Sequence, residues 1–321
     1  ASIVKELVEN ALDAGATTIN IDIKRGGRDT IQIADNGHGI PADQVDTAFL
    51  RHATSKLQHV GELEAIGTLG FRGEALAAIA AVSQVTVITR VKTDPAGVRL
   101  TMDGGVVIGR DKVGAPSGTV IAVDNLFYNT PARLKFLKTV ATEKRLIDEF
   151  VTKYALAYPA VRFRLTHDGR VTFQTSGSGD LRDVLVAVYG AELARQFMGI
   201  GESEIERGDR DKGLVSEDEA QSKIQNPKPP IEVFGFVAPP SQHRANRTHI
   251  TLFVNGRWIK DKNLTYAIIQ AYHTLLPSGR YPLAVVFVKM PLEQVDVNVH
   301  PTKTEVRFRE SGRVFGAVQK S

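Results

Sequence analysis

The chain of 321 residues contains no cysteine, which excludes disulfide bridges and thiolate metal sites. Its eight histidines are scattered without the spacing of a metal site. There is no run of 18 apolar residues, which argues against a membrane-spanning helix and a membrane partner. No signal peptide is recognisable. These absences favour a cytoplasmic protein.

The composition that is present suits two globular domains, since 42% of the residues are apolar and the chain is long enough for two cores. The net charge is only +4, but it is unevenly distributed. Residues 202–230 are polar and acid-rich and end in Asn226-Pro227-Lys228-Pro229-Pro230. We expect a flexible insertion there. The rest of the chain is more basic, which suits contact with a phosphate backbone.

One edge of the first predicted helix carries three oxygen-bearing side chains. Apolar residues recur at helical period between Ile3 and Ala14, and a glycine then ends the pattern. Glu6, Asn10 and Asp13 fall within roughly 60° of one another on this helix. An amphipathic helix with a solvated edge is the simpler interpretation. The functional one is that these oxygens suit Mg²⁺ and that a glutamate beside them deprotonates a water.

A glycine-containing turn follows a predicted hairpin whose strands cover residues 18–24 and 30–34. The turn reads Asp35-Asn36-Gly37-His38-Gly39. Glycine at 37 and 39 permits backbone angles closed to other residues and lets a ligand approach the chain. A carboxylate at the end of a strand can accept a hydrogen bond from an exocyclic amine. An ordinary Asp-Asn-Gly turn would carry the same residues.

A third stretch is rich in glycine and leads into a helix predicted over residues 74–82. It begins at Arg51-His52-Ala53-Thr54-Ser55-Lys56 and continues through four spaced glycines to Gly73. Backbone N–H groups at a helix start bind phosphate well, and the glycines suit a loop that closes over a nucleotide. Arg72 suits either the phosphates or the surface. Such a loop alone is a weak signal.

The order and spacing of the three pieces resemble the GHKL ATPases, and Leu69-Gly70-Phe71-Arg72-Gly73-Glu74-Ala75-Leu76 resembles the MutL branch, a family of DNA mismatch-repair proteins. The resemblance covers essentially the whole chain except 202–230. It implies that Glu6 is the general base, that Asn10 holds Mg²⁺ and that Asp35 binds the adenine amino group. The other residues that it implies in nucleotide binding are Asp13, Gly37, Gly39, Thr54, Ser55, Lys56, Gly70, Phe71, Arg72, Gly73, Glu74, Ala75 and Leu76.

Three later segments resemble the same family. Ser117-Gly118-Thr119-Val120 is similar to the fourth pocket motif, in which a threonine hydroxyl, here that of Thr119, reaches adenine through water. Residues 126–133 resemble a MutL signature and predict a helix start with Thr130 as N-cap. Residues 295–303 resemble a loop from which Lys303 reaches the γ-phosphate in a catalytic role. This contact would make domain orientation depend on the nucleotide; an exposed loop lysine is the simpler interpretation.

The expected fold is α/β (α+β). Residues 1–200 should form a GHKL-type α/β sandwich, with helices over one face of a mixed, mainly antiparallel sheet. Residues 201–321 should form a smaller, transducer-like βαβ domain that contains the insertion 202–230. Alternation predicts strands at 85–90, 119–124 and 162–166 in the first domain and at 231–237, 248–254 and 283–289 in the second, which also has a helix predicted at 263–275.

A cluster of basic residues surrounds the segment Phe253-Val254-Asn255-Gly256-Arg257. Its members are Arg244, Arg247, Arg257, Lys260 and Lys262. Lysine and arginine that contact phosphates give salt-sensitive binding without sequence preference. The resemblance makes Arg257 the first choice for DNA contact, followed by Arg244, Arg247 and Lys260. A solvated strand edge guarded by charge is the alternative.

The resemblance implies a slow, DNA-stimulated ATPase that uses ATP and Mg²⁺, forms a homodimer when ATP binds and acts as a switched clamp in mismatch repair. The partners it implies are single- and double-stranded DNA, the mismatch-recognition protein MutS and a downstream nuclease or helicase, in a bacterial-type cytosol or nucleoid. The alternative is a nucleotide-gated binding scaffold with negligible hydrolysis. Topoisomerase subunits, heat-shock chaperones and histidine kinases share the Asn helix and the Asp35 turn but lack the Gly-Phe-Arg-Gly-Glu-Ala-Leu segment.

The chain begins at Ala1-Ser2, without methionine, and members of the family carry an N-terminal arm and a C-terminal dimerisation domain. We therefore expect a fragment. Some members also carry a metal-dependent endonuclease in the C-terminal part. No Asp-Gln-His-Ala-x2-Glu-type motif occurs here, so no nuclease activity is expected from this chain.

Overall fold

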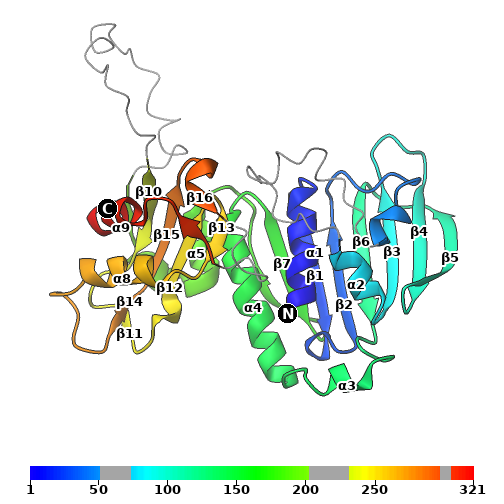
Figure 1. Ribbon diagram of the computed structural model, residues 1–321, viewed down its shortest axis with the longest axis horizontal. Helices are drawn as coiled ribbons and strands as arrows, with labels where there is room; N and C mark the ends of the chain where they lie inside the picture. The colour runs from blue at the N-terminus through cyan, green and yellow to red at the C-terminus, as the bar shows by residue number, and fades with distance from the viewer. Residues whose placement is uncertain (51–73, 202–230, 297–304) are drawn as a thin grey trace, which may run out of the picture. The chain divides into compact units, whose positions relative to one another are not determined.

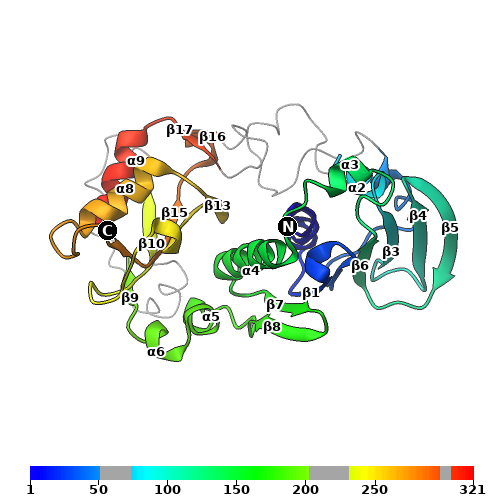
Figure 2. The same ribbon diagram turned by 90° about the horizontal axis from the view of Figure 1, so that it is seen from below.

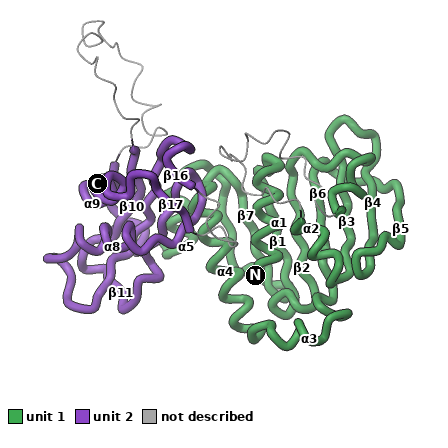
Figure 3. The backbone as a smooth tube through the Cα atoms, in the orientation of Figure 1, with its two compact units in different colours: residues 1–191 green, residues 192–321 purple. Residues whose placement is uncertain are grey.

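The computed structural model describes residues 1–50, 74–201, 231–296 and 305–321 (Figure 1). The chain divides into two compact units, Ala1–Ala191 and Glu192–Ser321, which Figure 3 colours separately. The sequence-based boundary at residue 200 lies further along the chain than this division after Ala191. The reason is that β9 (Met198–Ile200) pairs with β10 (Glu232–Val237) and so belongs to the sheet of the second unit. The insertion 202–230 lies outside the described residues.

The first unit is built on an eight-stranded sheet in the order β5-β4-β3-β6-β2-β1-β7-β8. Only the β1–β7 pair is parallel, so the sheet is mixed and mainly antiparallel, as predicted. Its strands are β1 (Thr18–Lys24), β2 (Thr30–Asp35), β3 (Gln84–Arg90), β4 (Gly97–Asp103), β5 (Val106–Val113), β6 (Gly118–Asp124), β7 (Arg162–His167) and β8 (Arg170–Gln174).

Helices cover one face of this sheet because alternate strand residues there are apolar. In β1, Ile19, Ile21 and Ile23 are buried while their neighbours are not. Figure 2 shows α1 (Ser2–Asp13), α2 (Ala75–Ala80) and α4 (Val140–Ala157) on the same side of the strands. The other helices of this part of the chain are α3 (Pro131–Leu134), α5 (Leu181–Tyr189) and α6 (Ala191–Ala194). None of the described helices is both long and apolar enough to cross a membrane.

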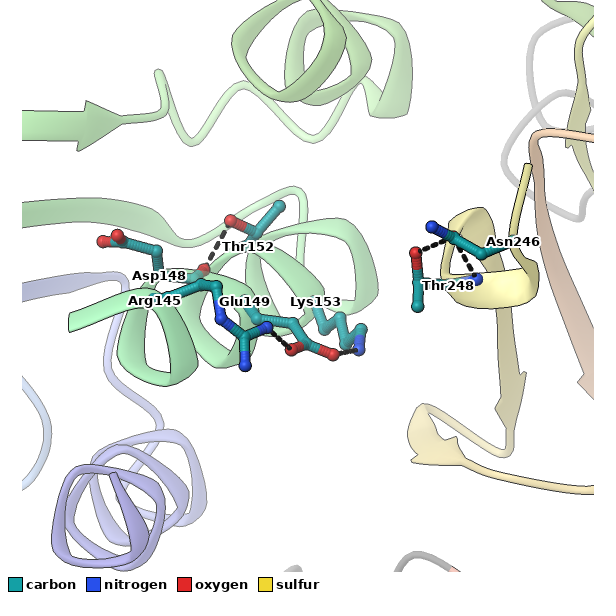
Figure 4. A network of polar contacts seen from close by, with 7 residues as sticks. All are labelled: Arg145, Asp148, Glu149, Thr152, Lys153, Asn246 and Thr248. Atoms are coloured by element: carbon teal, nitrogen blue, oxygen red, sulfur yellow. Dashed lines mark hydrogen bonds and ion pairs between the residues drawn. The ribbon is translucent and has the colours of Figure 1, made fainter. Parts of the chain in front are cut away.

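Helices α1 and α4 are joined by a buried hydrogen bond. The Tyr154 hydroxyl of α4 donates to Oε1 of Glu9 on α1 at 2.5 Å, and Glu9 is only 2% exposed. On α4, Glu149 forms ion pairs with the exposed Arg145 and with Lys153, which is itself buried (Figure 4). Both ion pairs join residues four apart, which are neighbours on the surface of a helix.

The turn between β7 and β8 is tied to α4 and to the β1–β2 connection. Asp168 accepts hydrogen bonds from the Lys144 side chain and from the backbone N–H of Arg25. These two donors, in that order, lower the pKa of the Asp168 carboxyl. Next to it, Nε2 of the buried His167 lies 2.8 Å from Oδ1 of Asp148 on α4.

The second unit is built on a five-stranded sheet in the order β13-β12-β15-β10-β9. The parallel strands β12 (Ile250–Val254) and β15 (Ala284–Lys289) are neighbours, and α8 (Lys262–Ala271) lies between them in the chain. The predicted βαβ crossover is therefore confirmed. The remaining described strands and α-helix of this unit are β11 (His243–Arg244), β13 (Arg257–Ile259), β14 (Tyr281–Pro282), β16 (Val295–Asp296), β17 (Arg307–Phe308) and α9 (Ser311–Lys320).

Side chains from α8 and α9 complete the apolar core of this unit. Leu264 of α8 and Val314 of α9 pack with Val286 of β15 in one buried cluster. Helix α8 ends at Ala271, earlier than predicted. Tyr272 follows it, and its hydroxyl donates instead to the backbone carbonyl of Ala238 at 2.6 Å. After Ala271 the backbone N–H groups of Tyr272 and His273 bond three residues back, to Ile269 and Gln270, in place of the α-helical pattern.

Candidate functional site

The turn after β2 is fastened to the C-terminal end of α1 and to the start of β1. The backbone N–H of His38 donates to the carbonyl of Ala14, just past α1, at 3.0 Å. Oδ1 of Asn36 accepts from the N–H groups of Thr17 and Thr18 at 2.9 and 2.8 Å. Because both sides of the turn are held, Asp35 projects from a fixed backbone at the end of its strand.

Both glycines of the turn are required by the chain's own backbone. A Cβ on Gly37 would lie 2.7 Å from the carbonyl oxygen of Ala14. At Gly39, φ is +76° and a Cβ would lie 2.3 Å from the carbonyl oxygen of Arg90. The predicted special backbone angle is thus found at Gly39 only. The space expected for a ligand beside these residues is, in the Cβ direction, filled by α1 and β3.

The Asp35 carboxylate is partly buried and is held by backbone donors. The N–H of Gly37 donates to Oδ1 at 2.8 Å, and the N–H of Thr119 also bonds to the carboxylate. Burial raises the pKa of Asp35 above its ordinary value, while these two N–H groups and the charge of His38 act in the opposite direction. A carboxylate has about four lone-pair positions, so this group can still accept a hydrogen bond from a ligand amine.

A buried threonine that the sequence reasoning missed joins the turn to β6. Thr89, 1% exposed, accepts a hydrogen bond from the N–H of Ile40 at 2.8 Å. Its Oγ1 also lies 3.0 Å from Oγ1 of Thr119 and 3.2 Å from the carbonyl oxygen of Gly118. The available signal is a hydroxyl at the last inward position of β3, after two buried valines.

The predicted oxygen-bearing edge of α1 is partly exposed. Glu6, Asn10 and Asp13 are all half-buried, while the apolar side of the helix packs into the core. Asp13 ends α1 next to Ala14, so the edge and the Asp35 turn meet. Across the described ranges, no three His, Cys, Asp or Glu side chains are close enough to hold a metal ion. Asn10 with one carboxylate is the kind of partial ligand set that Mg²⁺ completes with phosphates and water.

The rest of the predicted pocket falls largely outside the described residues. Glu74 is exposed and precedes α2 as its N-cap, and Ala75 and Leu76 are half-buried in its first turn. The residues outside the described ranges are Thr54, Ser55, Lys56, Gly70, Phe71, Arg72, Gly73 and Lys303.

The structure separates the predicted basic cluster into two parts. Arg247 is exposed, with its guanidinium 5.1 Å from the ring centre of Tyr281, which pairs with the half-buried Arg244. Lys260 is exposed and lies 5.1 Å from the ring centre of Trp258. Strand β13 runs antiparallel to β12, so Lys260, which follows the end of β13, lies beside the start of β12. Arg247 lies in the turn just before the start of β12. These cations therefore lie at the same end of their sheet.

The segment that carries Arg247 is shaped by the two residues on either side of it. Oδ1 of Asn246 accepts from the N–H of Thr248 at 3.2 Å and from its hydroxyl at 2.5 Å (Figure 4). This arrangement caps the short helical turn that presents Arg247.

Arg257 lies apart from these cations. It pairs with Val254 at the other end of β13 and is only 7% exposed. Side chains alternate along a strand, so it shares the face of Ile259, which packs in the core beneath α8. Contact of Arg257 with DNA stays a prediction, for a side chain that is buried in this structure.

Two family sequence models match the chain. The one described as histidine kinase-, DNA gyrase B-, and HSP90-like ATPase matches residues 1–110, and the one described as DNA mismatch repair protein, C-terminal domain, matches residues 213–321. The DNA mismatch repair protein MutL of Geobacillus kaustophilus is 45% identical over 314 residues. That alignment covers 98% of this chain and 46% of the relative, so the chain spans about half the length of the curated relative.

Solved structures agree with these matches. The N-terminal domain of a DNA repair protein aligns with a TM-score of 0.78 at 25% identity, over 99% of this chain and 91% of that one. The Aquifex aeolicus MutL ATPase domain complexed with ADP aligns with a TM-score of 0.62 at 27% identity, over 91% of this chain and 92% of that one. With the GHKL-type sheet, the strand-end aspartate and these matches together, the chain belongs to the MutL family of DNA mismatch repair proteins.

Proposed function

We propose that this chain is a slow, Mg²⁺-dependent ATPase that acts as a nucleotide-controlled switch in DNA mismatch repair. The observation that carries the proposal is the Asp35 carboxylate, which is partly buried, held by backbone N–H groups and still able to accept a hydrogen bond. An exocyclic amine such as that of adenine matches this acceptor. The ADP complex of the Aquifex aeolicus MutL ATPase domain supports the same ligand class.

The α1 edge supplies the groups for the phosphate end. Asn10 would hold Mg²⁺ through its amide oxygen, with Asp13 nearby. Glu6, one helical turn before Asn10, would orient and deprotonate the attacking water. Bound ATP and Mg²⁺ supply the phosphoanhydride and the charge that stabilises its cleavage. Lys303, outside the described residues, is proposed to reach the γ-phosphate and so report nucleotide state to the second unit.

The proposal extends to partners. ATP binding is expected to promote a homodimer, and the switch would act between MutS and a downstream nuclease or helicase, in the bacterial cytosol or nucleoid. DNA, single- or double-stranded, would contact the second unit without sequence preference. The exposed cations Arg247 and Lys260, with Arg244 beside them, support this contact. Arg257, which pairs with Val254 beside the β12–β13 turn at the other end of β13, is proposed to contact DNA separately from them.

The test of the catalytic proposal is ATP hydrolysis with Mg²⁺ at low salt, with and without single-stranded DNA. Glu6→Gln should abolish turnover while leaving ADP binding unchanged, because it removes the base and keeps the size of the side chain. The control is Glu192→Gln, an exposed glutamate in α6. If turnover is unchanged in Glu6→Gln while nucleotide still binds, the chain is instead a nucleotide-gated binding scaffold.

The DNA proposal is tested by the salt dependence of binding. Lys260→Ala should lower the slope of log K against log salt by about 0.7 to 0.9, the share of one phosphate contact. Lys320→Ala, an exposed lysine at the end of α9, should leave the slope unchanged. Arg257→Ala should lower thermal stability as well as DNA binding, because the residue is buried. If a variant of Arg257 loses DNA binding but keeps wild-type thermal stability, Arg257 contacts DNA directly.

A further inference from the structure

Thr89 lies where the two groups proposed to face the base are joined. Its neighbour on β6 is Thr119, which is in register with Thr89 on one side and with Asp35 on the other. Thr89 also holds the far end of the Asp35 turn, because its hydroxyl accepts a hydrogen bond from the N–H of Ile40. A single buried hydroxyl therefore contacts both the turn and the strand that form the base end of the site.

The hydrogen-bonding capacity of this hydroxyl limits where the protons can lie. A threonine hydroxyl donates once and accepts twice. The N–H of Ile40 can only donate and the carbonyl of Gly118 can only accept, so these two partners take one lone pair and the proton of Thr89. When Thr89 donates to Gly118, its remaining lone pair accepts the proton of Thr119, whose Oγ1 is 3.0 Å away; the distance between the two hydroxyls also allows the reverse direction.

This arrangement leaves Thr119 with lone pairs but no free proton. The Asp35 carboxylate is also an acceptor. Both groups at this end of the site would then present acceptors to a ligand or to an ordered water. Such a site matches a 6-amino purine, which offers a donor, and mismatches a 6-oxo purine, which offers an acceptor at the same position.

We infer that Thr89 is a positioning residue for base selectivity: it orients the Thr119 hydroxyl as an acceptor and fixes the Asp35 turn against β6. The inference rests on the proposed binding of adenine nucleotides. It adds a residue that does not touch the nucleotide and acts through Thr119 and Ile40.

The experiment compares the affinity for ADP and for GDP, with Mg²⁺, of the wild-type 321-residue chain and three variants. Thr89→Val keeps the shape and removes the hydroxyl; it should weaken ADP binding about threefold to tenfold, the size of one net hydrogen bond. It should also lower the preference for ADP over GDP, because Thr119 regains a proton that can donate. Thr89→Ser should restore both values. Thr86→Val, on the same strand but distant from the turn, is the matched control.

A double-mutant cycle separates positioning from general support of the fold. If Thr89 acts through Thr119, then Thr89→Val and Thr119→Val together should weaken ADP binding by less than the product of the two single effects. Fully multiplicative effects would overturn the inference, as would a folded Thr89→Val protein with wild-type affinity and selectivity. If Thr89→Val does not fold, Thr89→Cys, with a thiol that bonds weakly, is measured against the same criteria.

Failure of the inference is distinguishable from failure of the proposed function. If the wild-type chain binds ADP and loses it on Asp35→Asn, but Thr89→Val changes nothing, only the role of Thr89 is refuted. If the wild-type chain binds no ADP, the proposed function is refuted and the role of Thr89 with it.

Discussion

Replacing Asp35 by asparagine should remove nucleotide binding without destabilising the protein. Burial raises the pKa of Asp35, so the fold favours the neutral form of this side chain relative to water. A raised carboxyl pKa means that stability is lost as pH rises from the unfolded pKa through the folded one. At neutral pH the ionised Asp35 therefore costs stability, and the neutral amide of the same shape avoids that cost. The variant without ligand should be at least as stable as the wild type at pH 7.

The effect on binding has the opposite sign. Asparagine has one acceptor oxygen where aspartate has two, and the N–H of Gly37, 2.8 Å from Oδ1, competes for it. Either this N–H or the ligand amine then faces an NH₂ group. Losing a hydrogen bond to a charged acceptor costs about 1.5 to 3 kcal/mol, and an unpaired buried donor adds about 1 to 3 kcal/mol. The total is about 3 kcal/mol or more, roughly a hundredfold in the Kd of ADP.

The assay combines calorimetric titration with ADP and thermal unfolding from pH 4 to pH 8. The stability advantage of Asp35→Asn should shrink toward low pH, where wild-type Asp35 is itself protonated. Asp43→Asn, an exposed carboxylate a few residues further on, serves as the control. Wild-type ADP affinity in Asp35→Asn would refute the assignment of the base acceptor. A loss of stability at pH 7 that matches the loss of binding would refute the electrostatic argument.

Three further outcomes are expected from the first unit. Gly39→Ala should cost at least about 2 kcal/mol in urea unfolding, because its φ is positive and its Cβ would lie 2.3 Å from the carbonyl oxygen of Arg90; unchanged stability would contradict that geometry. Tyr154→Phe should cost about 1.5 to 3 kcal/mol, since it removes the donor to the buried Glu9 carboxylate, with an unchanged m-value as the check on compactness. The pKa of Asp168 is lowered, chiefly by its hydrogen bond from Lys144 on α4. The stability that this carboxylate contributes is therefore present above its unfolded pKa and is lost as pH falls through the lower folded pKa. Asp168→Asn should flatten the acid-unfolding curve in that range, and an unchanged curve would contradict the assignment.

Much of the first unit is readable from the sequence because its signals are local. The helical period ends α1 at Asp13, with Gly15 just beyond it at a φ of +70°. Strict alternation predicts β1, β3 and β7, since one face of each strand is buried and the other is not. The α1 edge and the Asp35 turn are predictable for the same reason.

The tertiary structure decided which of these local pieces became neighbours. Asp35, Thr89 and Thr119 are distant in the sequence, and only the pairing of β6 with both β2 and β3 brings them together. The local pattern shows Thr89 as an inward hydroxyl of β3 but does not record that pairing, so the role proposed for Thr89 was not predictable. Arg257 is a second example. A basic residue next to a polar turn is predicted to be exposed, but Arg257 is buried because it points to the same side of β13 as Ile259. The sequence alone therefore determined the elements, their exposed edges and the family resemblance. Strand pairing across long separations, which depends on burial of the whole sheet, decided which side chains form the site.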